Sequence, residues 1–161
     1  MAEPHPHRTI EVVRGRMTDK RAEQLLRFWS ANGALDEAAG RRRLPEVVCV
    51  LLDDAGEIAG VNSVYAGDAP LVGRRFWIYR NFLLPAGADA APAMMSAAFR
   101  ALEEEFDPSG GGPIGLCALI ADRELLRRHP EAVWPEIGML YAGYTVDGKQ
   151  VRIAYFEGAL I

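Results

Sequence analysis

The sequence predicts a mixed α/β domain in which helices flank both faces of a mostly antiparallel central sheet. Two turn sequences, Asp53-Asp54-Ala55-Gly56 and Asp147-Gly148, each join two runs of β-favouring residues and predict hairpins. Elsewhere a segment with helical periodicity separates successive strand-like runs. Hairpins require antiparallel pairing, whereas an intervening helix permits parallel pairing, so the sheet is expected to contain both.

Length and composition are those of one globular domain. The chain has 161 residues, of which 50% are hydrophobic and 25% are charged. This length is sufficient for one core without metals or disulfides. We therefore expect a single domain over residues 1–161 with a loose N-terminal tail at 1–8. The chain lacks a secretory signal and an apolar run of the roughly 20 residues that span a bilayer, which predicts a soluble, cytoplasmic protein without membrane contact.

The charge and the candidate metal ligands exclude some functions. A formal charge of −4 argues against nucleic-acid binding, which normally requires a basic surface. His5, His7 and His129 have no metal-ligand spacing, so no metal site is expected. Cys49 and Cys117 lie in apolar runs, which favours core packing over a nucleophilic or redox role.

The first third of the chain predicts one strand and two helices. Residues 9–13 form a strand-like run. Thr18 is a suitable N-cap for a helix that ends at Asn32-Gly33. A shorter helix is expected over residues 35–43 before Pro45 stops it.

The middle of the chain predicts three consecutive strands and a long helix. The strands are EVVCVLLD (46–53), EIAGVNSVYAG (57–67) and RRFWIYRNFLLP (74–85), the last closed by its proline. The helix follows over residues 86–106 with Pro92 in its first turn, where proline is tolerated. Its apolar stripe comprises Met95, Ala98, Leu102 and Phe106.

The remainder predicts a buried strand, a helix and a terminal hairpin. PIGLCALI (113–120) is short, apolar and bounded by turn residues, and ADRELLRRH (121–129) reads as a helix. The runs 139–146 and 150–158 flank Asp147-Gly148 and form the hairpin.

This order over nearly the whole chain resembles the GNAT acyltransferase superfamily. The stretches DDAGEIAGVNSVY, FLLP and LYAGYTVDG are similar to the family in detail. The resemblance implies a GNAT-like sheet and acetyl-CoA lying between the fourth and fifth strands. It also implies transfer of an acetyl group to an amine of a small molecule or a protein. The cofactor-binding residues that it implies are Phe82, Leu83, Leu84, Gly87, Ala88, Ala91 and Ala93.

The phosphate-binding segment departs from the family pattern, which has Arg or Gln, two residues, Gly, one residue, and Gly or Ala. Ala88 replaces the basic or amide residue and Ala91 the first glycine, while Ala93 agrees. Asp89 adds negative charge near the expected pyrophosphate, and Pro92 removes one N–H donor. The segment therefore predicts weakened or absent CoA binding, and Asp89 is read equally as a helix N-cap.

Acyl transfer to an amine requires a base and an acid. The family often has a tyrosine in the helix after its fifth strand, but here His129 or Arg128 occupies that approximate position. His129 and Tyr141 are the candidate acids, with surface capping and sheet packing as their alternatives. Tyr144 is a further nearby tyrosine. For the base the candidates are Glu57 and Glu136, which are also read as solvated side chains.

Arg80 and Asn81 interrupt an apolar strand and are candidates for lining a substrate cleft. Alternatively, Arg80 projects from a sheet edge or forms a buried ion pair.

Three functional hypotheses follow. The first is an N-acetyltransferase that uses acetyl-CoA. The second is a non-catalytic GNAT-like module that binds another ligand, a protein partner or a second copy in a homodimer. The third is an unrelated α/β domain that binds a small molecule, since fold order alone never establishes function.

Overall fold

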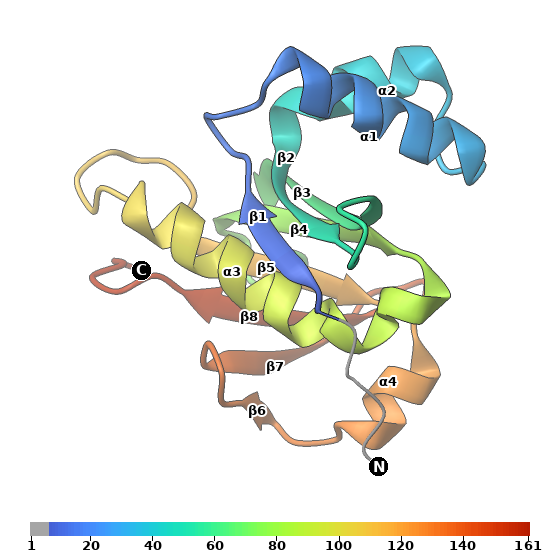
Figure 1. Ribbon diagram of the computed structural model, residues 1–161. Helices are drawn as coiled ribbons and strands as arrows, with labels where there is room; N and C mark the ends of the chain where they lie inside the picture. Colours follow the sequence, from blue (N-terminus) through green and yellow to red (C-terminus); the bar gives the residue numbers. More distant parts are fainter. Residues whose placement is uncertain (1–6) are drawn as a thin grey trace. The chain divides into compact units, whose positions relative to one another are not determined.

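The computed structural model describes residues 7–161, and Figure 1 labels the helices and strands. These residues form two compact units. Unit 1 contains the described residues up to 63 together with 81–98, and unit 2 contains 64–80 and 99–161. Most of the tail expected at residues 1–8 lies outside the described residues. The helical elements are α1 (Asp19–Ala31), α2 (Glu37–Arg43), η1 (Leu44–Glu46), η2 (Pro85–Ala90), α3 (Ala91–Glu104) and α4 (Arg123–Arg128), where η denotes a 3₁₀ helix. The strands are β1 (Thr9–Val12), β2 (Val47–Leu52), β3 (Ile58–Asp68), β4 (Arg75–Leu83), β5 (Gly115–Ile120), β6 (Val133–Trp134), β7 (Met139–Tyr144) and β8 (Gln150–Tyr155).

The strands form one sheet in the order β1-β2-β3-β4-β5-β8-β7-β6. Neighbouring strands β4 and β5 pair in parallel, with Trp77 opposite Leu116 and Tyr79 opposite Ala118. The pairs β1–β2, β2–β3, β5–β8, β6–β7 and β7–β8 are antiparallel. The prediction of a mixed, mostly antiparallel sheet with flanking helices is therefore confirmed.

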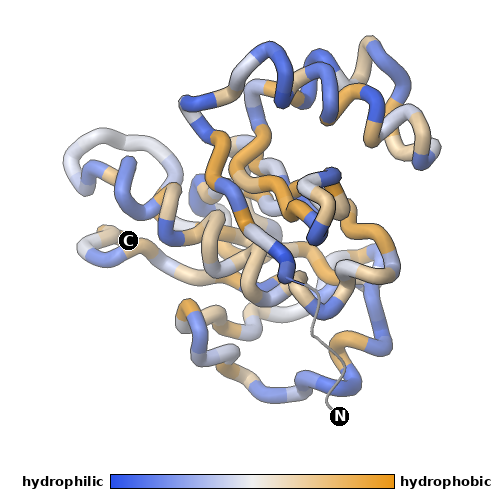
Figure 2. Tube along the Cα trace, viewed as in Figure 1, coloured by the Kyte–Doolittle hydropathy of each residue, from blue (hydrophilic) through white to orange (hydrophobic). Residues whose placement is uncertain are grey.

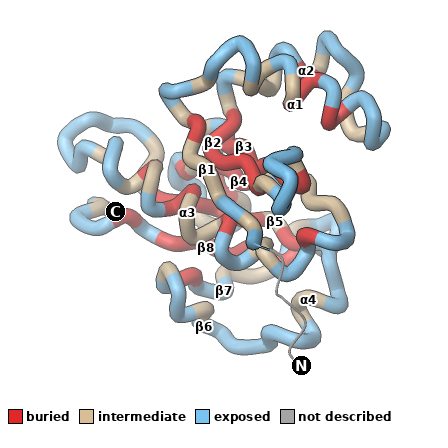
Figure 3. The backbone as a smooth tube through the Cα atoms, in the orientation of Figure 1, coloured by how far each residue is buried: buried red, intermediate tan, exposed pale blue. Residues whose placement is uncertain are grey.

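The core of unit 1 packs α1 against β2. Strand β2 is apolar in Figure 2 and largely buried in Figure 3, and it contributes Val47 and Val50. Helix α1 begins where expected, because the Thr18 side chain accepts a hydrogen bond from the Arg21 N–H. The core cluster contains Val13, Leu25, Leu26, Phe28, Trp29, Val47, Val50 and Val61.

Helices α1 and α2 approach each other closely at Gly40. A Cβ at this position would lie 2.8 Å from the Leu26 Cδ2 atom and 3.2 Å from the Trp29 Cε3 atom. The absence of a side chain at Gly40 therefore permits this helix contact.

The core of unit 2 is formed by β4, β5 and β8. Its buried cluster contains Ala69, Phe76, Ile78, Cys117, Val151 and Ile153. The hairpin between β7 and β8 turns at Asp147-Gly148 as predicted. Gly148 has a φ of 86°, which glycine adopts without steric cost.

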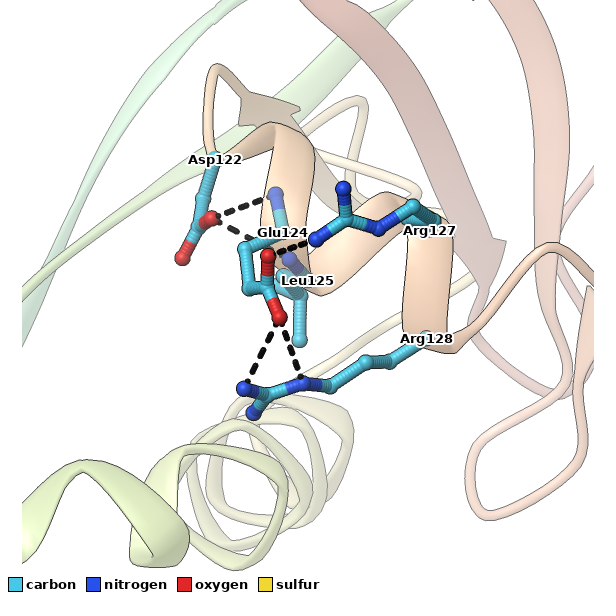
Figure 4. Close-up of polar contacts among 5 residues, drawn as sticks. All are labelled: Asp122, Glu124, Leu125, Arg127 and Arg128. Carbon is cyan, nitrogen blue, oxygen red and sulfur yellow. Dashed lines mark hydrogen bonds and ion pairs between the residues drawn. The ribbon is translucent and has the colours of Figure 1, made fainter.

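Helix α4 is a short, exposed helix with its own charge network (Figure 4). The Asp122 carboxylate caps it by accepting hydrogen bonds from the Glu124 and Leu125 N–H groups. Glu124 pairs with both Arg127 and Arg128. The basic pair at the end of α4 is thus held by a carboxylate on the same helix.

Some predicted details differ from the structure. The segment 130–138 contains β6, which the sequence analysis did not expect, because a two-residue strand leaves little pattern. In α3 the buried methionine is Met94, whereas Met95 is only partly buried. Among residues 7–161, no helix is both long and apolar enough to cross a bilayer.

Candidate functional site

The end of β4 in unit 1 is anchored by its side chains. Phe82 and Leu84 pack against the core of unit 1, and the Phe82 ring lies 5.7 Å from that of Phe28 in an edge-on arrangement. Leu83 points to the other face of the strand and covers Gly60. These three predicted cofactor residues thus have packing roles, and cofactor contact by them stays a prediction.

The segment after β4 turns tightly through η2 into α3. Gly87 is buried, and a Cβ there would lie 3.0 Å from the Leu51 Cδ2 atom, so the backbone lies close to β2. The Gly87 N–H donates to the Leu84 carbonyl. Pro92 is the second residue of α3, where its missing N–H breaks no helical hydrogen bond. The close approach to β2 therefore accounts for the glycine at position 87, independently of any cofactor.

Asp89 forms an ion pair with Arg8, whose guanidinium also donates to the Ala86 carbonyl. Asp89 lies inside η2, two residues before α3 begins, so its interpretation as the N-cap of α3 is wrong. Its side chain is 78% exposed, whereas that of Arg8 is only 20% exposed. The carboxylate that was expected to repel a pyrophosphate is thus offset by an adjacent guanidinium.

The start of α3 is fixed to the sheet by a buried amide. The Asn62 Oδ1 atom accepts a hydrogen bond of 2.7 Å from the Cys49 N–H, and its Nδ2 atom donates one of 2.9 Å to the Met94 carbonyl. Asn62 is 1% exposed and lies beside an irregularity in the β2–β3 register. This side chain therefore positions the first turn of α3 relative to β2.

The first turn of α3 has no negative side chain of its own. The helix has 14 residues and carries no acidic residue in its first turn, so its N-terminal dipole is not offset there. Ala88, Ala91 and Ala93 have small side chains, and Arg8 pairs with Asp89. The Ala91 N–H already donates to the Ala88 carbonyl and Pro92 has no N–H, so the first two residues of α3 offer no free backbone donor.

Unit 2 contains a second polar cluster, on one face of β7 and β8. Arg152 lies opposite Tyr141 in the register, and Gln150 lies opposite Tyr144. Because side chains alternate along a strand, Gln150 and Arg152 lie on the face opposite Val151 and Ile153. This face of β7 and β8 therefore carries polar and aromatic side chains, whereas the opposite face of β8 belongs to the core of unit 2.

Arg152 is a buried cation with neutral partners. It is 1% exposed, its Nε donates to the Gln150 Oε1 atom at 2.6 Å, and its Nη2 donates to the Glu131 carbonyl at 2.8 Å. Its guanidinium carbon lies 3.9 Å from the centroid of the Trp134 ring. The buried Nη1 atom has no hydrogen-bond partner. Burial lowers the pKa of Arg152 from its ordinary value, while the charges of Glu131, Tyr144 and Tyr141 oppose this change.

His129 and Tyr141 both border this cluster. The Trp134 Nε1 atom donates to the His129 carbonyl at 3.1 Å, and the two rings lie 6.3 Å apart. The Tyr141 ring lies 5.9 Å from the Tyr144 ring, and the Tyr144 hydroxyl accepts from the Gln150 Nε2 atom at 3.2 Å. The structure thus brings both candidate acids into the surroundings of Trp134 and Arg152.

Comparison with known proteins finds a match in structure only. No family model and no curated protein matches the sequence. A bacterial toxin superposes with a TM-score of 0.56 at 11% identity, covering 95% of this chain and 93% of that one. The GNAT family N-acetyltransferase YhbS from Escherichia coli, in complex with CoA, superposes with a TM-score of 0.54 at 17% identity, covering 98% and 94%. A GNAT family acetyltransferase from Brucella melitensis in complex with acetyl-CoA gives 0.51 at 12% identity, covering 98% and 93%.

The chain has the GNAT fold. Its match extends over nearly the whole of each related chain, so both units belong to that fold.

The other candidate residues of this GNAT-fold chain lie elsewhere. Glu57 is exposed in the turn before β3, where its N–H donates to the Asp53 carboxylate. Glu136 is exposed in the segment between β6 and β7. Arg80 lies over the Tyr65 ring at 4.5 Å from its centroid, and Asn81 is exposed. Catalytic and substrate roles for these residues stay predictions.

The cysteines have the core positions that the sequence predicts. Both Cys49 and Cys117 are 0% exposed, and burial raises the pKa of each thiol to about 11. Such thiols are poor nucleophiles at neutral pH. In the described part of the chain, histidine, cysteine and carboxylate side chains form no group able to hold a metal ion.

Sequence reasoning missed Arg8 and Arg152 as members of these clusters. Arg8 was assigned to the tail, and nothing in the local sequence links it to Asp89, 81 positions away. Arg152 had a detectable signal, because Gln150 and Arg152 place polar side chains at alternate positions of an otherwise apolar strand.

Proposed function

We propose that this chain is an acyl-CoA-dependent N-acyltransferase that transfers an acetyl group from acetyl-CoA to an amine of a small molecule or a protein. The observation that carries the proposal is the GNAT fold combined with a start of α3 whose nearest carboxylate, Asp89, is compensated by Arg8. In this proposal, backbone donors that follow Pro92 in the first turn of α3 bind the pyrophosphate, next to the small side chains of Ala88, Ala91 and Ala93.

When bound, acetyl-CoA supplies an activated acetyl thioester. The acceptor nitrogen forms a bond to the acetyl carbonyl carbon while the carbon–sulfur bond breaks. One proton leaves the nitrogen, and one proton must reach the departing sulfur. We assign proton donation to Tyr141 or His129, which border the cluster around Arg152. Glu57 is the proposed base.

The test is acetyl transfer by the full chain. Acetyl-CoA is mixed with a panel of small amines and amine-bearing peptides, and released CoA thiol is followed with a chromogenic thiol reagent. Because both cysteines are buried, they contribute little background in the folded protein. Removing the proton donor, by Tyr141→Phe or His129→Gln, is expected to lower kcat by about 10²- to 10⁴-fold. The matched control is Tyr155→Phe, whose ring packs 5.4 Å from Phe76 in the core of unit 2.

The negative outcome is equally informative. Acetyl-CoA that binds but is not turned over with any amine would contradict the transferase assignment and favour a non-catalytic module on the same fold. If both donor variants keep the kcat of the unmodified chain, the transferase function stands, but the assignment of Tyr141 or His129 as proton donor is wrong.

A further inference from the structure

The unpartnered Nη1 atom of Arg152 is the least explained polar group in unit 2. It is buried, and the bonds of the guanidinium go to an amide oxygen, a backbone carbonyl and the face of Trp134. Among residues 7–161, no carboxylate forms an ion pair with Arg152. A buried guanidinium normally has a carboxylate or another anion as a partner, because burying its charge is costly.

The nearest acidic side chain does not fill this role. Glu131 is exposed and contacts Arg152 through its backbone carbonyl, and its carboxylate acts only as a nearby charge. Tyr141 and Tyr144, which flank the cluster, are also half-exposed, at 46% and 53%. Arg152 itself is 1% exposed, and the partly exposed Tyr141 and Tyr144 side chains lie at the edge of its cluster.

We infer that Arg152 binds the carboxylate of the acceptor, so that the substrate is an amine that also carries a carboxylate, such as an amino acid. That the ligand is the acceptor of the acyl group rests on the proposed transferase function. The carboxylate site itself rests only on the geometry around Arg152. A carboxylate matches the paired donors of a guanidinium, and Nη1 is the donor left for it. The hydroxyls of Tyr141 and Tyr144 supply further donors, and the aromatic rings favour an apolar side chain on the ligand.

Access to Nη1 requires movement of its cover. Trp134 lies across the guanidinium and belongs to β6, which pairs with β7 through only two residues, Val133 and Trp134. Its ring is half-buried, donates a hydrogen bond to the His129 carbonyl and lies edge-on to the His129 ring. In this inference, rotation of the Trp134 ring admits the ligand to the guanidinium, and the ladder between β7 and β8 does not depend on that side chain.

The experiment uses two probes that differ by one carboxylate. L-Phenylalanine and phenethylamine have the same ring and amine, but only phenylalanine has a carboxylate. Each is titrated into the ¹⁵N-labelled full chain without acetyl-CoA, and the Arg152 Nε–H signal, assigned with Arg152→Lys, is followed by NMR. Phenylalanine is expected to shift this signal saturably and to bind about 10- to 100-fold more tightly than phenethylamine.

Two variants complete the design. Arg152→Met is expected to remove the preference for phenylalanine. Arg127→Met should leave it intact, because the side chain of Arg127 is 74% exposed on α4 and pairs with Glu124. The comparison of the two probes on the unmodified chain needs no variant, so it remains decisive even if Arg152→Met fails to fold.

The outcomes separate this inference from the proposed function. Equal binding of the two probes, or an Arg152 signal that moves with neither, overturns the carboxylate site. A carboxylate-dependent shift supports the site even when no acetyl transfer occurs. Conversely, transfer to amines without a carboxylate, at rates equal to those for amino acids, supports the transferase and overturns the substrate class.

Discussion

The guanidinium carbon of Arg152 lies 3.9 Å from the centroid of the Trp134 ring, and the buried Nη1 atom of the same guanidinium has no partner. A cation stacked on an indole gains electrostatic attraction, but this gain does not replace a carboxylate. Arg152 is therefore better explained by a ligand than by the stability of the fold.

This reading predicts that Arg152→Met costs little stability. Methionine fills much of the same volume under Trp134 and removes a buried, incompletely paired charge. The Gln150 Oε1 atom and the Glu131 carbonyl lose their donor, which offsets the gain from removing the charge. The free energy of unfolding is therefore expected to lie within about 1 kcal/mol of the unmodified value, as measured by urea denaturation. Arg152→Ala is the control, since it also leaves a cavity and should lose about 2 kcal/mol or more. A large, equal loss in both variants would mean that the guanidinium stabilises the fold.

A second prediction concerns the charge balance between Arg8 and Asp89. Arg8→Met leaves the Asp89 carboxylate uncompensated two residues before α3, so acetyl-CoA should bind more weakly. The double variant Arg8→Met/Asp89→Asn should recover most of this affinity. Stability should change by only about 0.2–1 kcal/mol, since the Asp89 carboxylate is 78% exposed and the pair is screened by solvent on that side. Calorimetric titration measures the affinities, and identical values for all three proteins would contradict a phosphate site here.

The Asn62 amide is predicted to be essential for anchoring α3. Asn62→Leu leaves the Cys49 N–H without its acceptor and removes the side-chain bond to the Met94 carbonyl, which should cost about 2–4 kcal/mol in free energy of unfolding. Asn81→Leu, at an exposed asparagine of β4, should change it by less than about 0.5 kcal/mol. Hydrogen exchange should accelerate most in the first turn of α3. Equal effects of the two substitutions on stability would refute the anchoring role.

The buried thiols predict a loss of stability at alkaline pH. The pKa of both Cys49 and Cys117 is raised from 9.0 to about 11, because burial disfavours the thiolate. A raised pKa means that this contribution is fully present below pH 9.0 and is lost as pH rises through about 11. Each thiol contributes about 2–3 kcal/mol. Urea denaturation of the unmodified chain and of Cys49→Ala/Cys117→Ala should show a steeper decline between these pH values in the former, and parallel declines would contradict burial of the thiols.

The sequence predicted most elements because their signals are local. Thr18 capped its helix, Asp147-Gly148 formed the hairpin turn, and the apolar run of β2 was buried as expected. Each of these depends on neighbouring residues only. The two-residue strand β6 was missed because so short a strand has no period.

The candidate site was less predictable because its contacts join distant residues. The partner of Asp89 is 81 positions away, and Arg152 meets the Glu131 carbonyl 21 positions away. The local pattern allowed Asp89 to be an N-cap, but Asp89 lies inside η2 and pairs with the distant Arg8. Whether the Asp89 carboxylate repels an anion depends on the cation that lies beside it in the folded structure, and the local sequence does not contain that cation.

The central claim is that the start of α3 receives the phosphates of acetyl-CoA, and a thermal-shift titration tests it most directly. A ligand that binds only the folded state raises Tm with concentration. We predict such a rise for the unmodified chain, a reduced rise for Ala91→Asp in the first turn of α3, and an unchanged rise for Ala38→Asp in the exposed first turn of α2. No rise at millimolar acetyl-CoA, or equal rises in all three proteins, would contradict the account.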